Sequence, residues 1–306
     1  MQEIPLITNI QRFCLHDGPG VRTTIFIKGC SLRCPWCSNP ECQNPNYDIY
    51  FQENKCLRKR GVTCNINCDE LFKSLQKFSQ INGENGSIYE FDFENFKESC
   101  PTKSLGVYGK KYSVDEIMEI LEKDILYFRN SGGGVTFSGG EPLLFDMKEL
   151  FMAIKRKGIN ICVETSLFVS TDVLRDTLPY IDFLIIDIKI LDEKLCKTII
   201  GGDITQYFDN IDYLMKNTVD TKFIFRFPVV YGYTYTQKNF KLLLDFINTY
   251  GITNLEIFSV HNLGKEKYNN LKRNYRDFEI VRYNDLKRIK EEIEVNTNAN
   301  VNILFF

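Results

Sequence analysis

Short β-branched and aromatic runs alternate with helical patterns along most of this 306-residue chain. Several runs are nearly continuous in apolar residues, as expected for parallel strands that are covered on both faces. One helical pattern begins at a capping box formed by Ser113 and Glu116. Repeated βα units with right-handed crossovers predict an α/β fold whose parallel sheet curls into a partial (β/α)6 barrel, because six strands are too few for a closed barrel of eight. The expected strands are Arg22–Lys28, Gly134–Ser138, Asn160–Thr165, Asp182–Lys189, Lys222–Val230 and Asn254–His261. The expected helices cover residues 113–130, 146–157, 171–178, 207–217, 236–250 and 283–293.

One region interrupts this alternation. Residues 42–111 are polar, rich in Asn and carry five cysteines, with no strong βα unit. A loop of that length without structure of its own would be unusual. We therefore expect a barrel domain formed by residues 1–41 and 112–306, and a small cysteine-rich insert at 42–111.

Composition excludes several classes of function. The formal net charge is −2, from 38 basic and 40 acidic residues, which argues against nonspecific nucleic-acid binding and against a polybasic membrane surface. We see neither a signal peptide nor a stretch as long as a membrane span. The expected location is the cytoplasm, where many cysteines serve as metal ligands or redox groups rather than as disulfides.

Three cysteines follow the first expected strand with the spacing C-x3-C-x2-C, at Cys30, Cys34 and Cys37. Three thiolates are one fewer than an iron–sulfur cube normally takes from protein, so one iron would be left open to a cofactor or substrate. The alternatives are a zinc loop that borrows a fourth ligand, or three unrelated buried thiols.

Residues that could bind a ligand or take part in catalysis lie at the ends of the other expected strands. The carboxyl ends of parallel barrel strands form the active-site face, so these residues are expected to converge with the three cysteines. They are Gly139, Gly140, Glu141 and Pro142 after the second strand, Glu164 and Thr165 at the end of the third, Asp187, Ile188 and Lys189 at the end of the fourth, Arg226 on the fifth, and His261 at the end of the sixth.

The cysteine motif, including Trp36 before its last cysteine, resembles the cluster motif of the radical S-adenosylmethionine superfamily, and residues 139–142 resemble its second motif. Within that superfamily, residues 16–26, 131–141, 187–189 and 261–265 are similar to the activating enzymes of glycyl radical enzymes, the group that contains pyruvate formate-lyase activating enzyme. The resemblance covers about residues 10 to 270.

The resemblance implies a set of roles. Cys30, Cys34 and Cys37 would hold a [4Fe–4S] cluster whose open iron binds S-adenosylmethionine. Asp17 would contact the glycine-bearing peptide, although an Asx turn explains it equally well. Glu164, Thr165 and Asp187 match positions around a monovalent cation. The residues expected to contact S-adenosylmethionine are Trp36, Ser38, Gly139, Gly140, Glu141, Asp187, Ile188, Lys189 and His261.

The implied activity is that of an anaerobic oxidoreductase. Reductive cleavage of S-adenosylmethionine gives a 5′-deoxyadenosyl radical, which removes a hydrogen atom from a glycine Cα of a partner glycyl radical enzyme. A flavodoxin or ferredoxin would supply the electron. The alternatives are a radical enzyme that acts on a small molecule or another peptide, and an iron–sulfur electron carrier without catalysis, which leaves residues 139–142, Lys189 and His261 unexplained.

The insert departs from the family pattern. Many activating enzymes of this group carry a ferredoxin-like insert with two four-cysteine motifs, whereas here only part of each remains. We expect one second [4Fe–4S] cluster on Cys56, Cys64, Cys68 and Cys100, with a zinc knot or no metal as alternatives. Cys42 could replace one ligand. In the barrel, Leu167 stands where the family usually has Gly, and Tyr231 stands where Pro often precedes Gly232.

Overall fold

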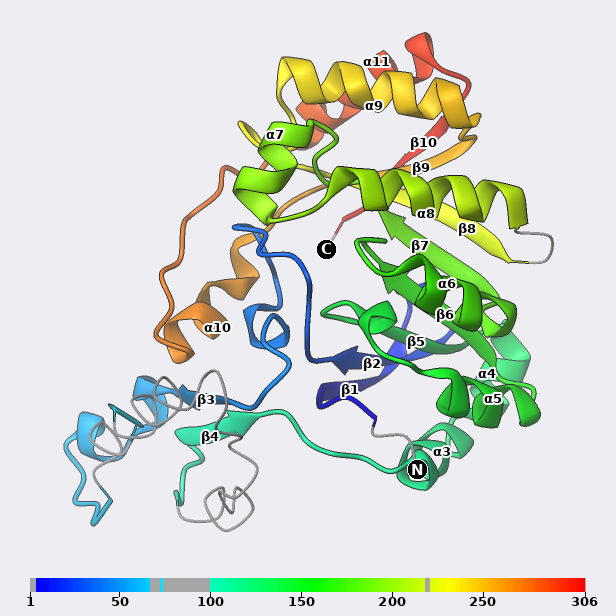
Figure 1. The fold of residues 1–306 in the computed structure, drawn as a ribbon. Coiled ribbons are helices and arrows are strands. Elements are labelled where there is room, and N and C mark those ends of the chain that lie inside the picture. The colour runs from blue at the N-terminus through cyan, green and yellow to red at the C-terminus, as the bar shows by residue number, and fades with distance from the viewer. Residues whose placement is uncertain (1–3, 67–71, 74–99, 218–220, 306) are drawn as a thin grey trace.

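The protein was analysed as a computed structural model that describes residues 4–66, 72–73, 100–217 and 221–305. Its centre is an eight-stranded sheet in the order β1-β2-β5-β6-β7-β8-β9-β10. Seven strands run parallel from β2 to β10, and β1 pairs antiparallel with β2 at one edge. Because no described ladder joins β1 to β10, the curled sheet is an open, partial barrel (Figure 1).

All six expected strands are present, and the main sheet has two described strands that were not expected. The six are β2 (Arg22–Ile27), β5 (Gly134–Gly139), β6 (Asn160–Thr165), β7 (Phe183–Asp187), β8 (Lys222–Val229) and β9 (Asn254–Ser259). The additions are β1 (Ile7–Cys14), whose polar and apolar residues mix as on an edge strand, and the short β10 (Asn300–Ile303). The expected six-strand core is therefore correct but incomplete.

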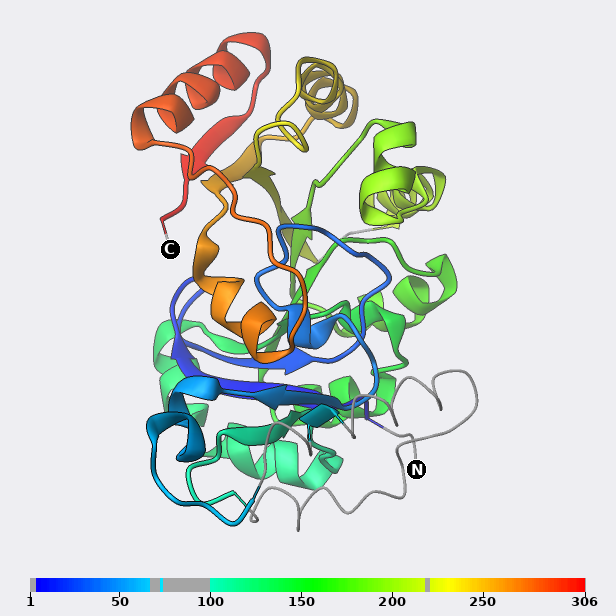
Figure 2. The ribbon, with the colours of Figure 1, turned by 90° about the vertical axis from the view of Figure 1, so that its left-hand side faces the viewer.

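Helices cover the outer side of the sheet (Figures 1 and 2). The Ser113–Glu116 capping box is confirmed, but its helix ends early, because the chain breaks at Asp124 into two helices. The α-helices are α3 (Val114–Glu122), α4 (Ile125–Ser131), α5 (Lys148–Arg156), α6 (Thr171–Thr177), α7 (Glu193–Leu195), α8 (Ile204–Asn217), α9 (Gln237–Tyr250), α10 (Lys265–Asn270) and α11 (Tyr283–Asn296). A π-helical turn, η7 (Cys196–Ile200), follows α7, and the 3₁₀ turns are η1 (Pro40–Cys42), η2 (Glu53–Lys55), η3 (Arg58–Arg60), η5 (Pro142–Leu144), η6 (Leu178–Tyr180) and η8 (Asn262–Gly264).

The described part of the expected insert forms its own small unit. Strand β3 (Asp48–Phe51) pairs antiparallel with β4 (Leu105–Tyr108). Phe51, Phe72, Leu105 and Val107 form a small apolar cluster with two cysteines, separate from the barrel core. The division of the chain at residues 42 and 111 stays a prediction.

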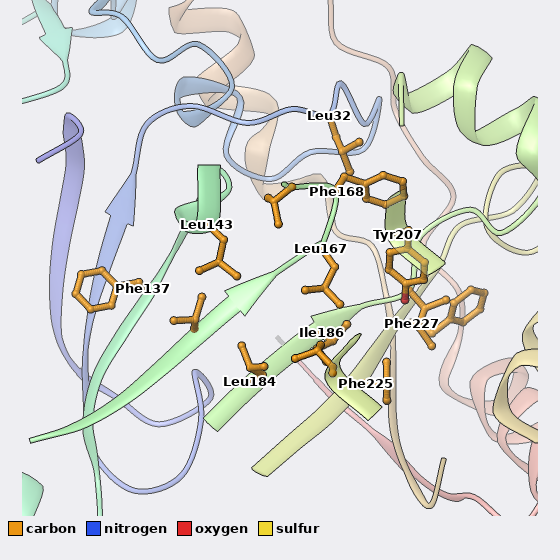
Figure 3. Packing of buried hydrophobic residues seen from close by; sticks show 14 of the residues in the cluster. Leu32, Phe137, Leu143, Leu167, Phe168, Leu184, Ile186, Tyr207, Phe225 and Phe227 are labelled. Carbon is orange, nitrogen blue, oxygen red and sulfur yellow. The ribbon is translucent and has the colours of Figure 1, made fainter. Parts of the chain in front are cut away.

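The main core lies between the sheet and its helices, and it supports the loops at the carboxyl ends of the strands. Figure 3 shows Leu32 of the cysteine loop and Phe168 of the loop after β6 side by side, above Leu167 and Tyr207. The Ser31 hydroxyl also donates a hydrogen bond to the Phe168 carbonyl at 2.9 Å. The cysteine loop is thus anchored on the hydrophobic core rather than held only at its ends.

None of the helices within the described ranges is both long and apolar enough to cross a membrane.

Candidate active site

The three-cysteine loop leaves the carboxyl end of β2 and returns beside it. Gly29, with φ of 108°, donates its N–H to the Cys42 carbonyl at 2.7 Å, and the Cys30 N–H reaches the Gln43 carbonyl at 3.2 Å. Within the loop, the Cys37 N–H donates to the Cys34 carbonyl at 3.1 Å. These bonds close residues 29–43 into one compact loop at the end of the strand.

The three thiols share one electrostatic environment. Burial raises the pKa of all three thiols above the ordinary value, to about 11 for Cys30. The positive charge of Lys189 lowers the pKa of each thiol, but this effect is smaller than that of burial. In the part of the chain that the structure describes, no three His, Cys, Asp or Glu side chains gather closely enough to hold a single metal ion. A [4Fe–4S] cluster does not need such convergence, because each thiolate binds a different iron. Three thiols on one loop beside a buried ammonium group therefore fit a three-thiolate cluster.

Glycines after β5 let two loops touch. A Cβ atom on Gly140 would lie 2.1 Å from the Gly29 carbonyl oxygen and 2.8 Å from that of Cys42. The Glu141 N–H donates to the same Gly29 carbonyl at 2.7 Å. The absent side chain of Gly140 therefore makes room for the backbone of the cysteine loop, a role that the expected contact with S-adenosylmethionine did not include.

Glu141 is fully buried and joins the loops after β5 and β6. Its carboxylate accepts hydrogen bonds from the Thr165 hydroxyl at 2.7 Å, and from the Ser166 N–H and hydroxyl at 2.8 and 2.7 Å. The Leu143 N–H donates to it at 3.3 Å. This geometry assigns Glu141 to holding loops in place, and it brings the expected site residue Thr165 into contact with Glu141.

Lys189 and Asp187 form an ion pair at the end of β7, with 2.9 Å between Nζ and Oδ2. Burial lowers the pKa of Lys189, but Asp187 and the cysteine thiols outweigh it and raise the pKa above the ordinary value. Lys189 is therefore a permanent cation that faces the cysteine loop. Ile188, between the two residues, is buried in the core.

A charged cluster inside the barrel centres on Arg226. Its guanidinium contacts Glu164 on β6 at 2.7 Å and Glu256 on β9 at 2.6 Å. It also donates to the His16 carbonyl at 2.8 Å, and Glu164 accepts a further hydrogen bond from Ser138. Glu164, expected beside a cation, is thus paired with a guanidinium here.

The segment that contains Asp17 precedes β2 and folds into the interior of the barrel. The Asp17 carboxylate accepts from the Thr24 hydroxyl at 2.5 Å, and its carbonyl accepts from the Thr136 hydroxyl at 2.6 Å. Together with the bond from Arg226 to His16, these contacts fix the segment in the same interior as the charged cluster.

The remaining expected site residues lie around the cysteine loop. Trp36 is buried and packs edge-on against Tyr233, with ring centroids 5.6 Å apart. A Cβ atom on Gly264 would lie 3.3 Å from the Ser38 backbone, so the segment after β9 touches the loop. Burial lowers the pKa of His261, and its Nδ1 accepts the Leu263 N–H at 3.3 Å.

Sequence reasoning missed part of the site. The Arg226 partner Glu256 was not anticipated, although a charged residue inside an apolar strand was a signal for it. Cys42, offered above as a replacement ligand for the insert, is buried, and its Sγ lies 3.2 Å from the Thr8 hydroxyl on β1; its use as a ligand stays a prediction. Leu167 adopts a left-handed φ of 59°, which explains why glycine suits that position.

Comparison with known proteins identifies the family of the chain. The radical SAM superfamily model matches residues 99–247. A (2S)-3-sulfopropanediol dehydratase activating enzyme from Klebsiella oxytoca is 38% identical, with 86% of this chain and 84% of that protein covered. A 4-hydroxyphenylacetate decarboxylase activating enzyme from Clostridium scatologenes is 35% identical, with 95% and 93% covered. A solved radical SAM methyltransferase from Sphaerobacter thermophilus shares the fold at a TM-score of 0.50 and 12% identity, with 97% of this chain and 77% of that one covered. The chain belongs to the radical SAM superfamily and, within it, to the glycyl radical enzyme activating enzymes.

Proposed function

We propose that this oxidoreductase installs a glycyl radical in a partner enzyme, with a [4Fe–4S] cluster on Cys30, Cys34 and Cys37. The observation that carries the proposal is the placement of these thiols on one closed loop beside the Lys189 ammonium. When bound, the cluster and S-adenosylmethionine would supply reductive cleavage of a carbon–sulfur bond and abstraction of a hydrogen atom from a glycine Cα.

The chain's own residues bind and orient the cofactor. Lys189 offers its charge to the methionyl carboxylate, while Asp187 at the end of β7 and His261 after β9 offer hydrogen-bond partners. Trp36 and Ser38 lie on the cysteine loop itself, and Ile188 lies between Asp187 and Lys189. Gly139 and Gly140, held by Glu141, keep the facing loop close.

Asp17 is proposed to orient the partner's glycine-bearing segment. Support comes from its place in the barrel interior, where Thr24 and Thr136 hold it. A positioned carboxylate can hold a peptide N–H and so orient the glycine.

A second cluster on Cys56, Cys64, Cys68 and Cys100 stays part of the proposal. Cys56 and Cys100 are both buried in the same apolar cluster, and Cys68 lies outside the described residues. Burial raises the pKa of the Cys100 thiol, but hydrogen bonds with Ser104, Leu105 and Thr102 outweigh burial and lower the pKa to about 6. Cys100 is therefore largely a thiolate at neutral pH, the form that binds metal. Iron counts test the idea: a variant with Cys30, Cys34 and Cys37 changed to Ala should keep about four irons, and loss of all iron contradicts it.

A monovalent cation near Glu164, Thr165 and Asp187 is also proposed. Support is limited to the three oxygen-bearing side chains at adjacent strand ends, whose present partners are Arg226, Glu141 and Lys189. If the site binds a cation, cofactor affinity should differ between potassium and tetramethylammonium salts at equal ionic strength. Equal affinity in both salts argues against it.

The proposed reductant is a flavodoxin or ferredoxin, and the proposed location is the cytoplasm. The ten described cysteines are free thiols, which suits a reducing compartment.

The test is anaerobic reconstitution with iron and sulfide, followed by dithionite and S-adenosylmethionine. Formation of 5′-deoxyadenosine is expected, and a glycyl EPR signal should appear only when a partner enzyme is added. Well-loaded protein that forms no 5′-deoxyadenosine refutes the proposal. The matched control is Lys189→Met, which should bind iron normally and require more S-adenosylmethionine.

A further inference from the structure

An ion pair between a buried carboxylate and a half-buried lysine lies beside the cysteine loop. Glu41, in η1, is only 5% exposed. Its Oε1 is 2.6 Å from the Nζ of Lys267 on α10, and the same Nζ donates to Asn39 Oδ1 at 2.8 Å. Its other oxygen, Oε2, is buried and accepts no hydrogen bond among the described residues. The carboxylate is therefore held by Lys267 while part of its charge stays uncompensated.

Further contacts seat the segment around α10 on the loop. A Cβ atom on Gly264 would lie 3.3 Å from the Cys37 carbonyl and from the Ser38 Cα. Arg273 donates to the Pro40 carbonyl and pairs with Asp48 at 2.7 Å. Figures 1 and 2 both show α10 beside the loop that follows β2. The ion pair is thus one of several bonds that hold residues 37–41 against α10.

The charge of Glu41 acts on the cysteine loop with little screening, because this carboxylate is buried, whereas water screens part of the charge of the half-buried Lys267. Lys267 follows Gly264, whose position for a Cβ atom lies 3.3 Å from the Cys37 carbonyl, and it pairs with Glu41 on the same loop. Because the two side chains carry opposite charges, they act on the cysteine loop with opposite signs.

We propose that Glu41 and Lys267 are positioning residues that tune the reduction potential of the cluster on Cys30, Cys34 and Cys37, Glu41 lowering it and Lys267 raising it. A negative charge nearby disfavours an added electron, and a positive charge favours it. The inference rests on the proposed cluster and concerns the ease of its reduction.

The experiment is an EPR redox titration of the full reconstituted chain, restricted to the signal that changes when S-adenosylmethionine is added. Glu41→Gln should shift the midpoint potential upward, and Lys267→Met should shift it downward. The double variant should lie between the single variants. If Glu41→Gln does not fold, the Lys267→Met shift alone decides, because Lys267 is partly exposed and its loss is tolerated more easily.

The matched control is the Glu53–Lys272 pair, which also joins the insert side to the segment after α10 but is exposed. Glu53→Gln and Lys272→Met should leave the potential unchanged. Shifts of the same sign in Glu41→Gln and Lys267→Met, or no shift in either, overturn the inference. A wild-type protein with no signal that responds to S-adenosylmethionine refutes the proposed function instead, so the two failures are distinct.

Discussion

The Glu141→Gln substitution separates two roles for this side chain. In the structure the carboxylate accepts four hydrogen bonds, and two of the donors are backbone N–H groups, of Leu143 and Ser166, which cannot act as acceptors. A Gln amide has one acceptor oxygen, so its NH₂ group must face one of these N–H groups. One buried donor is left unsatisfied at a cost of about 1–3 kcal/mol, and the remaining bonds lose their charge assistance. We expect a loss of about 2–4 kcal/mol in the free energy of unfolding.

The assay is anaerobic denaturant unfolding of the metal-free chain, followed by measurement of KM for S-adenosylmethionine in the reconstituted protein. Glu119→Gln on the exposed side of α3 is the control and should change stability by less than about 0.5 kcal/mol. Unchanged stability together with a raised KM refutes the loop-holding role and favours direct contact with the cofactor.

Three further substitutions have expected outcomes. Tyr207→Phe removes a buried hydroxyl that has no hydrogen-bond partner in the described part of the chain, so denaturant unfolding should show equal or greater stability; a loss above about 1 kcal/mol contradicts this. Asp124→Asn should cost about 1–3 kcal/mol at neutral pH. Burial raises the pKa of Asp124, but hydrogen bonds from Arg12 and Thr23 outweigh burial and lower the pKa. The stabilisation is therefore present above about pH 4 and is lost as the pH falls. In Asp124→Asn, the free energy of unfolding should depend less on pH than in the wild-type protein. Gly140→Ala places Cβ 2.1 Å from a backbone oxygen, so thermal stability and iron per chain should both fall, and normal iron loading contradicts the close approach.

Much of the barrel was predictable, because strand periodicity is a local property. The expected β6 matches the structure residue for residue, and the Ser113 capping box starts its helix as expected. The split of that helix at Asp124 was not predictable, because it depends on Arg12 and Thr23, more than 100 residues away in sequence. Strand β10 has only four residues and is defined by its pairing with β9.

The candidate site was predictable as a set of strand ends but not as a set of contacts. Spacing placed the cysteines on one loop, and parallel topology placed Lys189 beside it. Sequence could not show that Gly140 accommodates the backbone of the cysteine loop, or that the Glu141 carboxylate accepts hydrogen bonds from Ser166 and Thr165. These assignments depend on which atoms fill a gap of a few ångströms, and only tertiary packing decides that.

Leu167 offers a test of that packing. Its φ of 59° is strained for any residue with a Cβ atom, yet its side chain is fully buried (Figure 3). Truncation should cost about 2–5 kcal/mol from lost packing. Ala keeps the backbone strain, whereas Gly releases about 1 kcal/mol of it. We therefore expect Leu167→Gly to be more stable than Leu167→Ala by up to about 1 kcal/mol, against the usual order, in which Gly is less stable than Ala by a similar amount. Denaturant unfolding of both variants measures the difference, and a more stable Ala variant would show that burial alone, without backbone strain, explains this position.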